Sequence, residues 1–240
     1  IHGSGDGFDA NTISLRLNHE KSLSMQVAYN EAFRSAGLGD TPESSKIAFF
    51  DIYSCFPIAV EQACECVGLD TNVDDVSRMT LTGGLPYHGG PGSNYSGHGL
   101  CAVVEKLRTD AFRGKFGCVG ANGGWLTEHS VGIYSTSPPQ KTFSRRNHDS
   151  YSGNYQLPFD KFVHAPNGTG KILTWTIRYH RNEAETAVIL GEMVDGPDVG
   201  MRFFANSKPR DQSLSNWLLE GDRIGELVSI SSGDIVNYRR

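Results

Sequence analysis

One of the five cysteines, Cys55, lies where the sequence predicts that a strand gives way to a helix. Residues 47–52 form a short apolar run, typical of a strand buried on both faces, and Pro57 suits the first position of a helix. Cys55 would therefore stand at the carboxyl edge of a sheet, where ligands gather, and close to a helix N-terminus, whose dipole favours the reactive thiolate. The alternative is a small buried hydrophobic residue, the usual state of a free cysteine, and position alone leaves both interpretations open.

A glycine-rich segment follows at residues 83–92, with five glycines among its ten residues. Glycine permits positive φ angles and a close approach of the backbone to a ligand, and a helix predicted at 96–108 would offer free N–H groups to an anion or a developing oxyanion. The segment is not a Walker loop, because no Gly-Lys-Ser or Gly-Lys-Thr follows it. His88 and His98 are candidate polar groups here, although for a lone histidine we prefer the interpretation that it satisfies backbone groups.

The third candidate is a glycine turn at residues 120–124, between strands predicted at 115–124 and 128–135. It carries Asn122, whose amide can both donate and accept hydrogen bonds. Taken alone the pattern says little, because Asn-Gly is the commonest signal for a hairpin turn. We expect His129, in the following strand, to be structural.

Strands that alternate with helices predict an α/β layered fold for residues 1–137. A helix with one apolar face is predicted at 25–36 and stops at Gly37. The region should form a mixed sheet of about four or five strands flanked by helices. Cys55, His98 and Asn122 belong to separate segments, and we predict that they converge in one pocket on the carboxyl side of the sheet.

The rest of the chain has a different sequence pattern. Residues 138–154 are polar, with prolines, a glycine and no periodicity, and they predict a linker. Residues 155–240 alternate in the manner of strands and favour a small β-barrel with one short helix. The elements predicted there are strands at 172–179, 186–194, 200–205, 226–229 and 235–238 and a helix at 213–220.

The three candidate segments, in this order, resemble the thiolase superfamily, and in particular the thiolase-like proteins described as acetyl-CoA acetyltransferase-like. The resemblance covers residues 1–137, and its long middle motif makes it specific. The motifs are Tyr-Ser-Cys-Phe-Pro at 53–57, Gly-Gly-Leu-Pro-Tyr at 83–87, Gly-Gly-Pro-Gly-Ser-Asn-Tyr-Ser-Gly-His at 89–98 and Ala-Asn-Gly-Gly at 121–124.

The resemblance implies the C-terminal half of a thiolase fold, followed by the additional OB-like domain that thiolase-like proteins carry. It also implies a coenzyme A thioester as substrate, with no covalently bound cofactor and no metal. Cys55 becomes the candidate acid or base, with His98 and Asn122 to polarise or position it. The substrate-binding residues that it implies are Tyr53, Gly83, Gly84, His88, Gly90, Asn94 and Gly123.

The sequence departs from ordinary thiolases at several catalytic positions. Gly90 stands where the family has its activating histidine, and Tyr53 replaces the histidine or asparagine of the first loop. The acid/base cysteine of the family falls near residues 120–121, so Cys55 would take its place. The nucleophilic cysteine of the family belongs to an N-terminal half that this sequence does not contain, so we do not expect ordinary degradative thiolysis.

Two kinds of function follow from the resemblance. The first is an acyl-CoA-dependent acyltransferase of lipid metabolism, which performs acyl transfer or Claisen-type carbon–carbon bond chemistry on a thioester. The second is a non-catalytic acyl-CoA-binding protein, or a subunit that completes the site of a partner. Loss of turnover with intact ligand affinity in Cys55→Ala and His98→Ala variants would favour the first.

A thiolase subunit resembles two copies of one α/β unit packed face to face, and this chain supplies one copy. The implied partner is an N-terminal thiolase half or a second copy of the chain, in an oligomer. Without that partner, we expect one of the two helices at 25–36 and 57–67 to leave an exposed apolar face.

Composition limits the other partners. The net charge of −5, and basic residues that alternate with acidic ones in the β-rich region, argue against nucleic acid. No apolar run approaches the ~20 residues that span a bilayer. Cysteines without the spacing of a zinc site favour reduced thiols in a cytoplasmic compartment. The chain begins at Ile1 with no signal-peptide pattern. It also begins without Met, so we expect an upstream segment.

Overall fold

The computed structural model describes residues 1–139, 161–208 and 212–231, which form two compact units. The first unit contains Ile1–Asn11 and the chain from Glu20 to the linker. The second contains the C-terminal part of the chain and also Thr12–His19, so the chain enters it twice. Most of the predicted linker at 138–154 lies outside the described residues.

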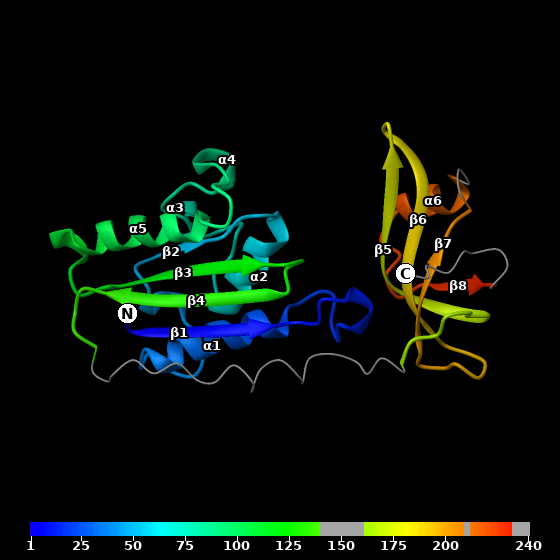
Figure 1. Cartoon of the computed structure of the whole chain (residues 1–240), viewed down its shortest axis with the longest axis horizontal. Coiled ribbons are helices and arrows are strands. Elements are labelled where there is room, and N and C mark those ends of the chain that lie inside the picture. Colours follow the sequence, from blue (N-terminus) through cyan, green and yellow to red (C-terminus); the bar gives the residue numbers. More distant parts are fainter. Residues whose placement is uncertain (140–160, 209–211, 232–240) are drawn as a thin grey trace. The chain divides into compact units, whose positions relative to one another are not determined.

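The first unit is built on a four-stranded mixed sheet with the order β1-β4-β3-β2 (Figure 1). β2 runs parallel to β3, and the other neighbours are antiparallel. This confirms the α/β class and the mixed sheet predicted from the sequence. The strands are β1 (Gly3–Phe8), β2 (Phe49–Ile52), β3 (Phe116–Gly123) and β4 (Glu128–Ser135).

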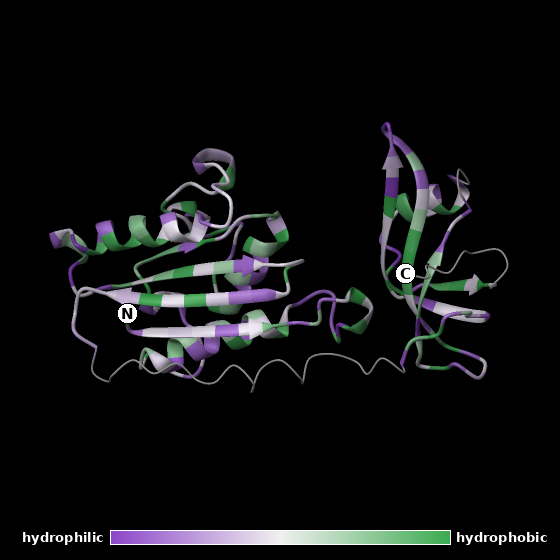
Figure 2. Ribbon diagram, viewed as in Figure 1, coloured by the Kyte–Doolittle hydropathy of each residue, from purple (hydrophilic) through white to green (hydrophobic). Residues whose placement is uncertain are grey.

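Successive residues of β3 face different helices, as the pleat of a strand requires. Cys118 packs in the core that includes α1 (Leu23–Ser35) and α2 (Pro57–Val67), whereas Val119 packs in the core that includes α5 (Tyr95–Leu107). Figure 2 shows the corresponding alternation of hydrophobic and paler residues along β4. Shorter helical turns complete the unit: η2 (Ser44–Lys46), α3 (Val76–Met79), α4 (Leu85–His88) and η3 (Asp110–Phe112).

β1 is not predictable from the sequence pattern, because this strand has no apolar alternation. Its inward positions are instead the glycines Gly3, Gly5 and Gly7, which face α1. A Cβ atom on Gly5 would lie 2.0 Å from the carbonyl oxygen of Ala28, so only glycine lets the helix approach this closely. The strand is held by this backbone contact and by its ladder with β4.

The prediction that one of the helices at 25–36 and 57–67 leaves a large exposed apolar face is wrong. Most apolar side chains of α1 and α2 are buried against the sheet of this chain, because both helices pack on one of its faces, and Leu23 and Ile58 are the large apolar side chains of these helices that stay exposed. The apolar groove of the first unit lies instead between α5 and β4 and has a volume of about 460 Å³. Its lining residues are Ile1, Leu100, Val104, Leu107, Arg108, Tyr134, Ser135 and Thr136.

The second unit is a four-stranded antiparallel sheet with the order β7-β6-β5-β8 and one helix. Four of the five predicted strands and the helix are present, and β7 and β8 form the edges within the described residues. The fifth strand, predicted at 235–238, lies outside those residues, and the OB-like barrel stays a prediction. The elements are β5 (Gly168–His180), β6 (Glu183–Met193), β7 (Arg202–Asn206), α6 (Gln212–Leu219) and β8 (Leu227–Ile230).

A buried arginine fixes the segment Thr12–His19 within the second unit. Arg202, on β7, donates to the carbonyl oxygen of Ser14 at 2.9 Å and to that of Arg16. The segment includes a single helical turn, η1 (Ile13–Leu15). The guanidinium thus satisfies backbone carbonyls of a segment that is remote from it in the sequence.

Candidate functional site

A cavity of about 690 Å³ opens at the carboxyl ends of the parallel strands β2 and β3. This edge is where ligands bind in open α/β sheets. Three segments contribute: the chain from the end of β2 into α2, the entry to α5, and the β3–β4 hairpin. The lining residues are Tyr53, Cys55, Phe56, Ile58, Ala59, Gly92, Ser93, Tyr95, Ser96, Ala121, Asn122, Gly123, Gly124, Trp125, Leu126 and Glu128.

Cys55 reaches the cavity from the turn between β2 and α2. Phe56 is the N-cap of α2 and has an extended backbone, with φ −142°, and Pro57 opens the helix without needing an N–H acceptor. The Cys55 side chain is partly exposed and lines the cavity. The sequence predicted the strand-to-helix turn, and of the two interpretations that it left open for this thiol the structure has the accessible one.

A buried carboxylate holds the glycine-rich segment against the end of β2. Asp51 is 1% exposed, and its Oδ2 atom accepts hydrogen bonds from the backbone N–H groups of Leu81 and Thr82 at 2.8 and 3.0 Å. Ser54 adds a second tie, because its Oγ accepts from the N–H of Leu85 at 3.0 Å. These contacts fix the entry to the segment relative to β2 and to the turn that carries Cys55.

His98 lies in the first turn of α5 and is exposed, and it is not among the residues that line the cavity. Its ring centroid is 5.1 Å from that of His88, which in turn lies 5.8 Å from the ring of Tyr95. Tyr95 packs on Tyr53, with centroids 5.2 Å apart. A row of rings therefore links His98 to the cavity wall.

Asn122 lies within β3, where it pairs with His129 of β4, rather than in the turn that the sequence predicted. The turn itself is formed by residues 124–127, between the two strands. The ladder continues for one pair beyond Asn122, to Gly123 and Glu128, and so holds the asparagine in an extended backbone at the edge of the cavity.

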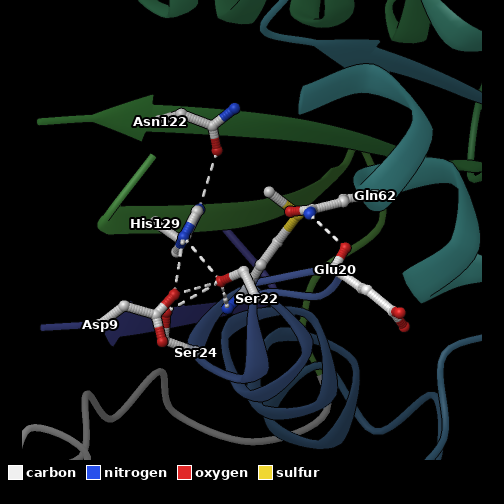
Figure 3. Close-up of polar contacts among 8 residues, drawn as sticks. Asp9, Glu20, Ser22, Ser24, Gln62, Asn122 and His129 are labelled. Carbon is white, nitrogen blue, oxygen red and sulfur yellow. Dashed lines mark hydrogen bonds and ion pairs between the residues drawn. The ribbon is translucent and has the colours of Figure 1, made fainter. Parts of the chain in front are cut away.

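Behind Asn122 lies a buried chain of polar side chains (Figure 3). His129 is 3% exposed, and its Nδ1 lies 3.0 Å from Asn122 Oδ1. Its Nε2 lies 3.0 Å from Ser22 Oγ, and Ser22 donates to Asp9 Oδ2 at 2.6 Å. Ser22 is also the N-cap of α1, because its Oγ accepts from the N–H of Met25 at 3.0 Å.

The carboxylate at the far end of this chain is held in its ionised form. Burial alone would raise the pKa of Asp9, but hydrogen bonds with His129, Ser22 and Ser24 outweigh it and leave the pKa below the ordinary value. Asp9 Oδ2 also lies 3.8 Å from His129 Nε2. The arrangement is not a hydrolase triad, because the carboxylate lies on the serine side of the imidazole and Asn122 occupies the Nδ1 side.

Of the residues that the sequence singled out, Cys55, Asn122, Tyr53 and Gly123 line the cavity. The others do not line it, namely His98, Gly83, Gly84, His88, Gly90 and Asn94. The sequence patterns did not indicate the roles of Asp9, Ser22 and Asp51, and His129 was expected to be structural. Only Asp51 carried a signal, as a charged residue in a strand predicted to be buried.

Within residues 1–139, 161–208 and 212–231, no group of three or more histidine, cysteine, aspartate or glutamate side chains is arranged to hold a metal ion. Over the same ranges, no helix combines the length and the apolar character needed to cross a membrane.

Two solved structures of thiolases or thiolase-like proteins are similar to this chain. A monomeric SCP2-thiolase-like protein type 1 from Mycobacterium smegmatis is 36% identical, with a TM-score of 0.77 over 96% of this chain and 48% of that one. The peroxisomal 3-ketoacyl-CoA thiolase of Saccharomyces cerevisiae also matches, at 16% identity and a TM-score of 0.38, over 56% of this chain and 33% of that one, and carries no argument here. No family model and no curated protein matches the sequence.

The chain belongs to the thiolase-like superfamily. It spans about half the length of the Mycobacterium smegmatis protein that it matches. The motifs at 53–57, 83–98 and 121–124 thus lie in a fold of the class that they indicated.

Proposed function

We propose that the cavity binds the thioester end of an acyl-CoA and that Cys55 moves a proton during acyl transfer or a Claisen-type condensation, with Asn122 as a hydrogen-bond donor. The observation that carries the proposal is that Cys55 and Asn122 come from separate elements of a thiolase-like fold and line one cavity. A positioned acid or base of this kind contributes about 10²–10⁴-fold to a rate.

The lining of the cavity suits such a ligand. Phe56, Ile58, Trp125 and Leu126 offer apolar surface for an acyl chain, and the amide of Asn122 offers a polar contact for the thioester carbonyl. In the family the nucleophilic cysteine belongs to the other half of the fold. We therefore propose that acyl transfer requires a complementary N-terminal half.

A complementary half is better supported than a second copy of this chain. The Mycobacterium smegmatis relative is described as monomeric and is about twice as long as the region that this chain matches. We propose that the half docks on the apolar groove between α5 and β4, where Leu100 and Val104 are partly exposed.

One observation favours a second candidate, an acyl-CoA-binding protein without catalysis. Among the described residues that line the cavity there is no histidine, and His98 packs on His88 instead. Gly90 also occupies the position of the activating histidine of thiolases. Binding would then persist without a proton relay.

The binding proposal is tested by placing a charge in the cavity wall. Ile58→Glu should weaken the binding of an acyl-CoA at least about tenfold in calorimetric titrations, because the carboxylate repels the phosphates and removes apolar surface. Ile224→Glu is the control, because Ile224 lies in the second unit and is 52% exposed, close to the 46% of Ile58. Equal affinities of the two variants would reject the cavity as the site.

The catalytic proposal is tested by Cys55→Ala in the chain combined with a complementary half. We expect the acyl-transfer rate to fall about 100-fold or more while the affinity for acyl-CoA changes by less than about threefold. Cys101→Ala is the control, since Cys101 is exposed and does not line the cavity. An unchanged rate in Cys55→Ala would leave the binding protein as the better proposal.

A further inference from the structure

We propose that His129 is a positioning residue that orients the Asn122 amide so that its NH₂ group, and not its carbonyl oxygen, serves the ligand carbonyl in the cavity. The inference rests on the proposed function, because it assigns a task to Asn122 within that site.

The amide of Asn122 has a defined orientation. An asparagine side chain has one end that donates and one end that accepts, and a half-turn about its last bond exchanges them. His129 Nδ1 lies 3.0 Å from Asn122 Oδ1, and an amide oxygen can only accept, so the ring nitrogen donates. Figure 3 shows the amide nitrogen on the side away from the ring. Within the described part of the chain Asn122 Nδ2 has no hydrogen-bond partner.

The imidazole of His129 is held at both of its ring nitrogens. His129 is buried, and the ladder of β3 and β4 sets its backbone opposite Asn122. Ser22 gives its single proton to Asp9 Oδ2 and accepts from the first turn of α1, so His129 Nε2, 3.0 Å from Ser22 Oγ, also donates. The ring therefore holds a proton on each nitrogen, and Asp9 Oδ2 lies 3.8 Å from Nε2. A ring fixed at both nitrogens cannot rotate without losing contacts in a buried environment, where unpaired polar groups are costly.

This orientation of the amide suits a thioester ligand. A carbonyl oxygen needs a donor, and a preorganised donor stabilises the charge that develops on that oxygen in acyl transfer. If the amide were free to turn, its own oxygen would face the ligand carbonyl for part of the time and repel it. The Asp9–Ser22–His129 chain removes that alternative before the ligand arrives.

The test compares two ligands that differ only in the carbonyl group. An acyl-CoA thioester and the matching S-alkyl-CoA thioether should bind the wild-type chain with a ratio of affinities of about 3–10 in favour of the thioester, as expected for one hydrogen bond. His129→Gln and Asn122→Ala should lower this ratio to about 1 while thioether affinity stays within about twofold. His2→Gln is the control, because His2 is also buried and hydrogen-bonded, to the carbonyl oxygen of Ser137, but does not line the cavity.

A second readout follows the amide itself. In the ligand-free chain, NMR should show one ordered pair of Asn122 side-chain NH₂ signals, which Asp9→Asn and His129→Gln shift or broaden and His2→Gln does not. If wild type binds neither ligand, the proposed function fails and the NMR result alone decides the inference. An unchanged ligand ratio in a folded His129→Gln variant, or Asn122 NH₂ signals that do not respond to it, would overturn the inference.

Discussion

The five cysteines differ in what covers their sulfur atoms. Burial, with a smaller effect of Asp74, raises the pKa of Cys64 to about 11. Burial and then Glu65 raise that of Cys66 to about 12, and burial raises that of Cys118 still further. Cys55 and Cys101 are accessible. A thiol with a pKa near 11 is ionised in only ~0.1% of molecules at pH 8, and the thiolate is the reactive form.

We therefore predict a large difference in alkylation. Iodoacetamide at pH 8 should label Cys101 and Cys55 in the folded chain at least about tenfold faster than Cys64, Cys66 and Cys118, because the latter are buried or barely ionised. Mass spectrometry of peptides after timed labelling measures the rates. Labelling of all five at one rate in the folded state would contradict this assignment.

The ionised Asp9 predicts a dependence of stability on pH. Its native pKa is lowered, so its contribution is fully present above the ordinary carboxyl value of about 4 and is lost as the pH falls through the lower native value. Asp9→Asn should lower the free energy of unfolding by about 1–3 kcal/mol at pH 7, and the difference from wild type should shrink below about pH 4. Urea denaturation between pH 2 and pH 7 measures this. Asp110→Asn is a surface control, since its side chain is 98% exposed, and a difference that persists unchanged at pH 2 would contradict the prediction.

At the residue scale, the sequence could indicate candidate site residues but not the buried residues that hold them in place. Cys55 and Asn122 were found because each follows a local signal, a strand-to-helix junction and a glycine turn. Asp9, Ser22 and His129 are brought together by β1, α1 and β4, and no local pattern links them. The position of the His98 side chain could not be predicted either, because it is set by a tertiary contact, the packing of its ring on His88.

At the scale of elements, the contact between β1 and α1 makes a strong prediction. Gly5→Ala should lower the free energy of unfolding by at least about 2 kcal/mol, because the added carbon would lie 2.0 Å from a helix carbonyl oxygen that cannot move alone. Gly221→Ala is the control, since nothing lies within 4 Å of its added carbon. Denaturation curves measure both variants, and equal midpoints would show that the helix can shift.

The elements with periodic signals were predictable and β1 was not. α2 has the bounds 57–67 that its apolar face and Pro57 indicated, and β4 has the bounds of its alternating pattern. β1 is specified by glycines that admit a helix, which is a property of a pair of elements. The exposed face expected on one of α1 and α2 was wrong for the same reason, because the pattern shows an apolar stripe but not which surface covers it.

At the scale of the molecule, the groove between α5 and β4 predicts association. The chain alone should self-associate in size-exclusion chromatography with light scattering, and a complementary thiolase half should convert it to a one-to-one complex. Val104→Glu should weaken that complex at least about tenfold, because it places a charge in the groove. Val76→Glu, at a side chain that is 63% exposed elsewhere, is the control. A monomer that unfolds cooperatively without a partner would contradict the prediction.

The segment Thr12–His19 belongs to the second unit, while the residues on both sides of it belong to the first. The chain therefore passes from one unit to the other three times rather than once. A protease cut between residues 139 and 161 would therefore nick the molecule without dividing it. The amino-terminal fragment would still carry the carbonyl groups that Arg202 binds, and the two fragments should elute together until a denaturant separates them. The carboxy-terminal fragment made alone should fold poorly, since its buried guanidinium would lack those acceptors, and adding the amino-terminal fragment in trans should restore it. A protein engineer could therefore split the chain between residues 139 and 161 into two fragments that reassemble. The same position is unsuitable for removing or exchanging the second unit.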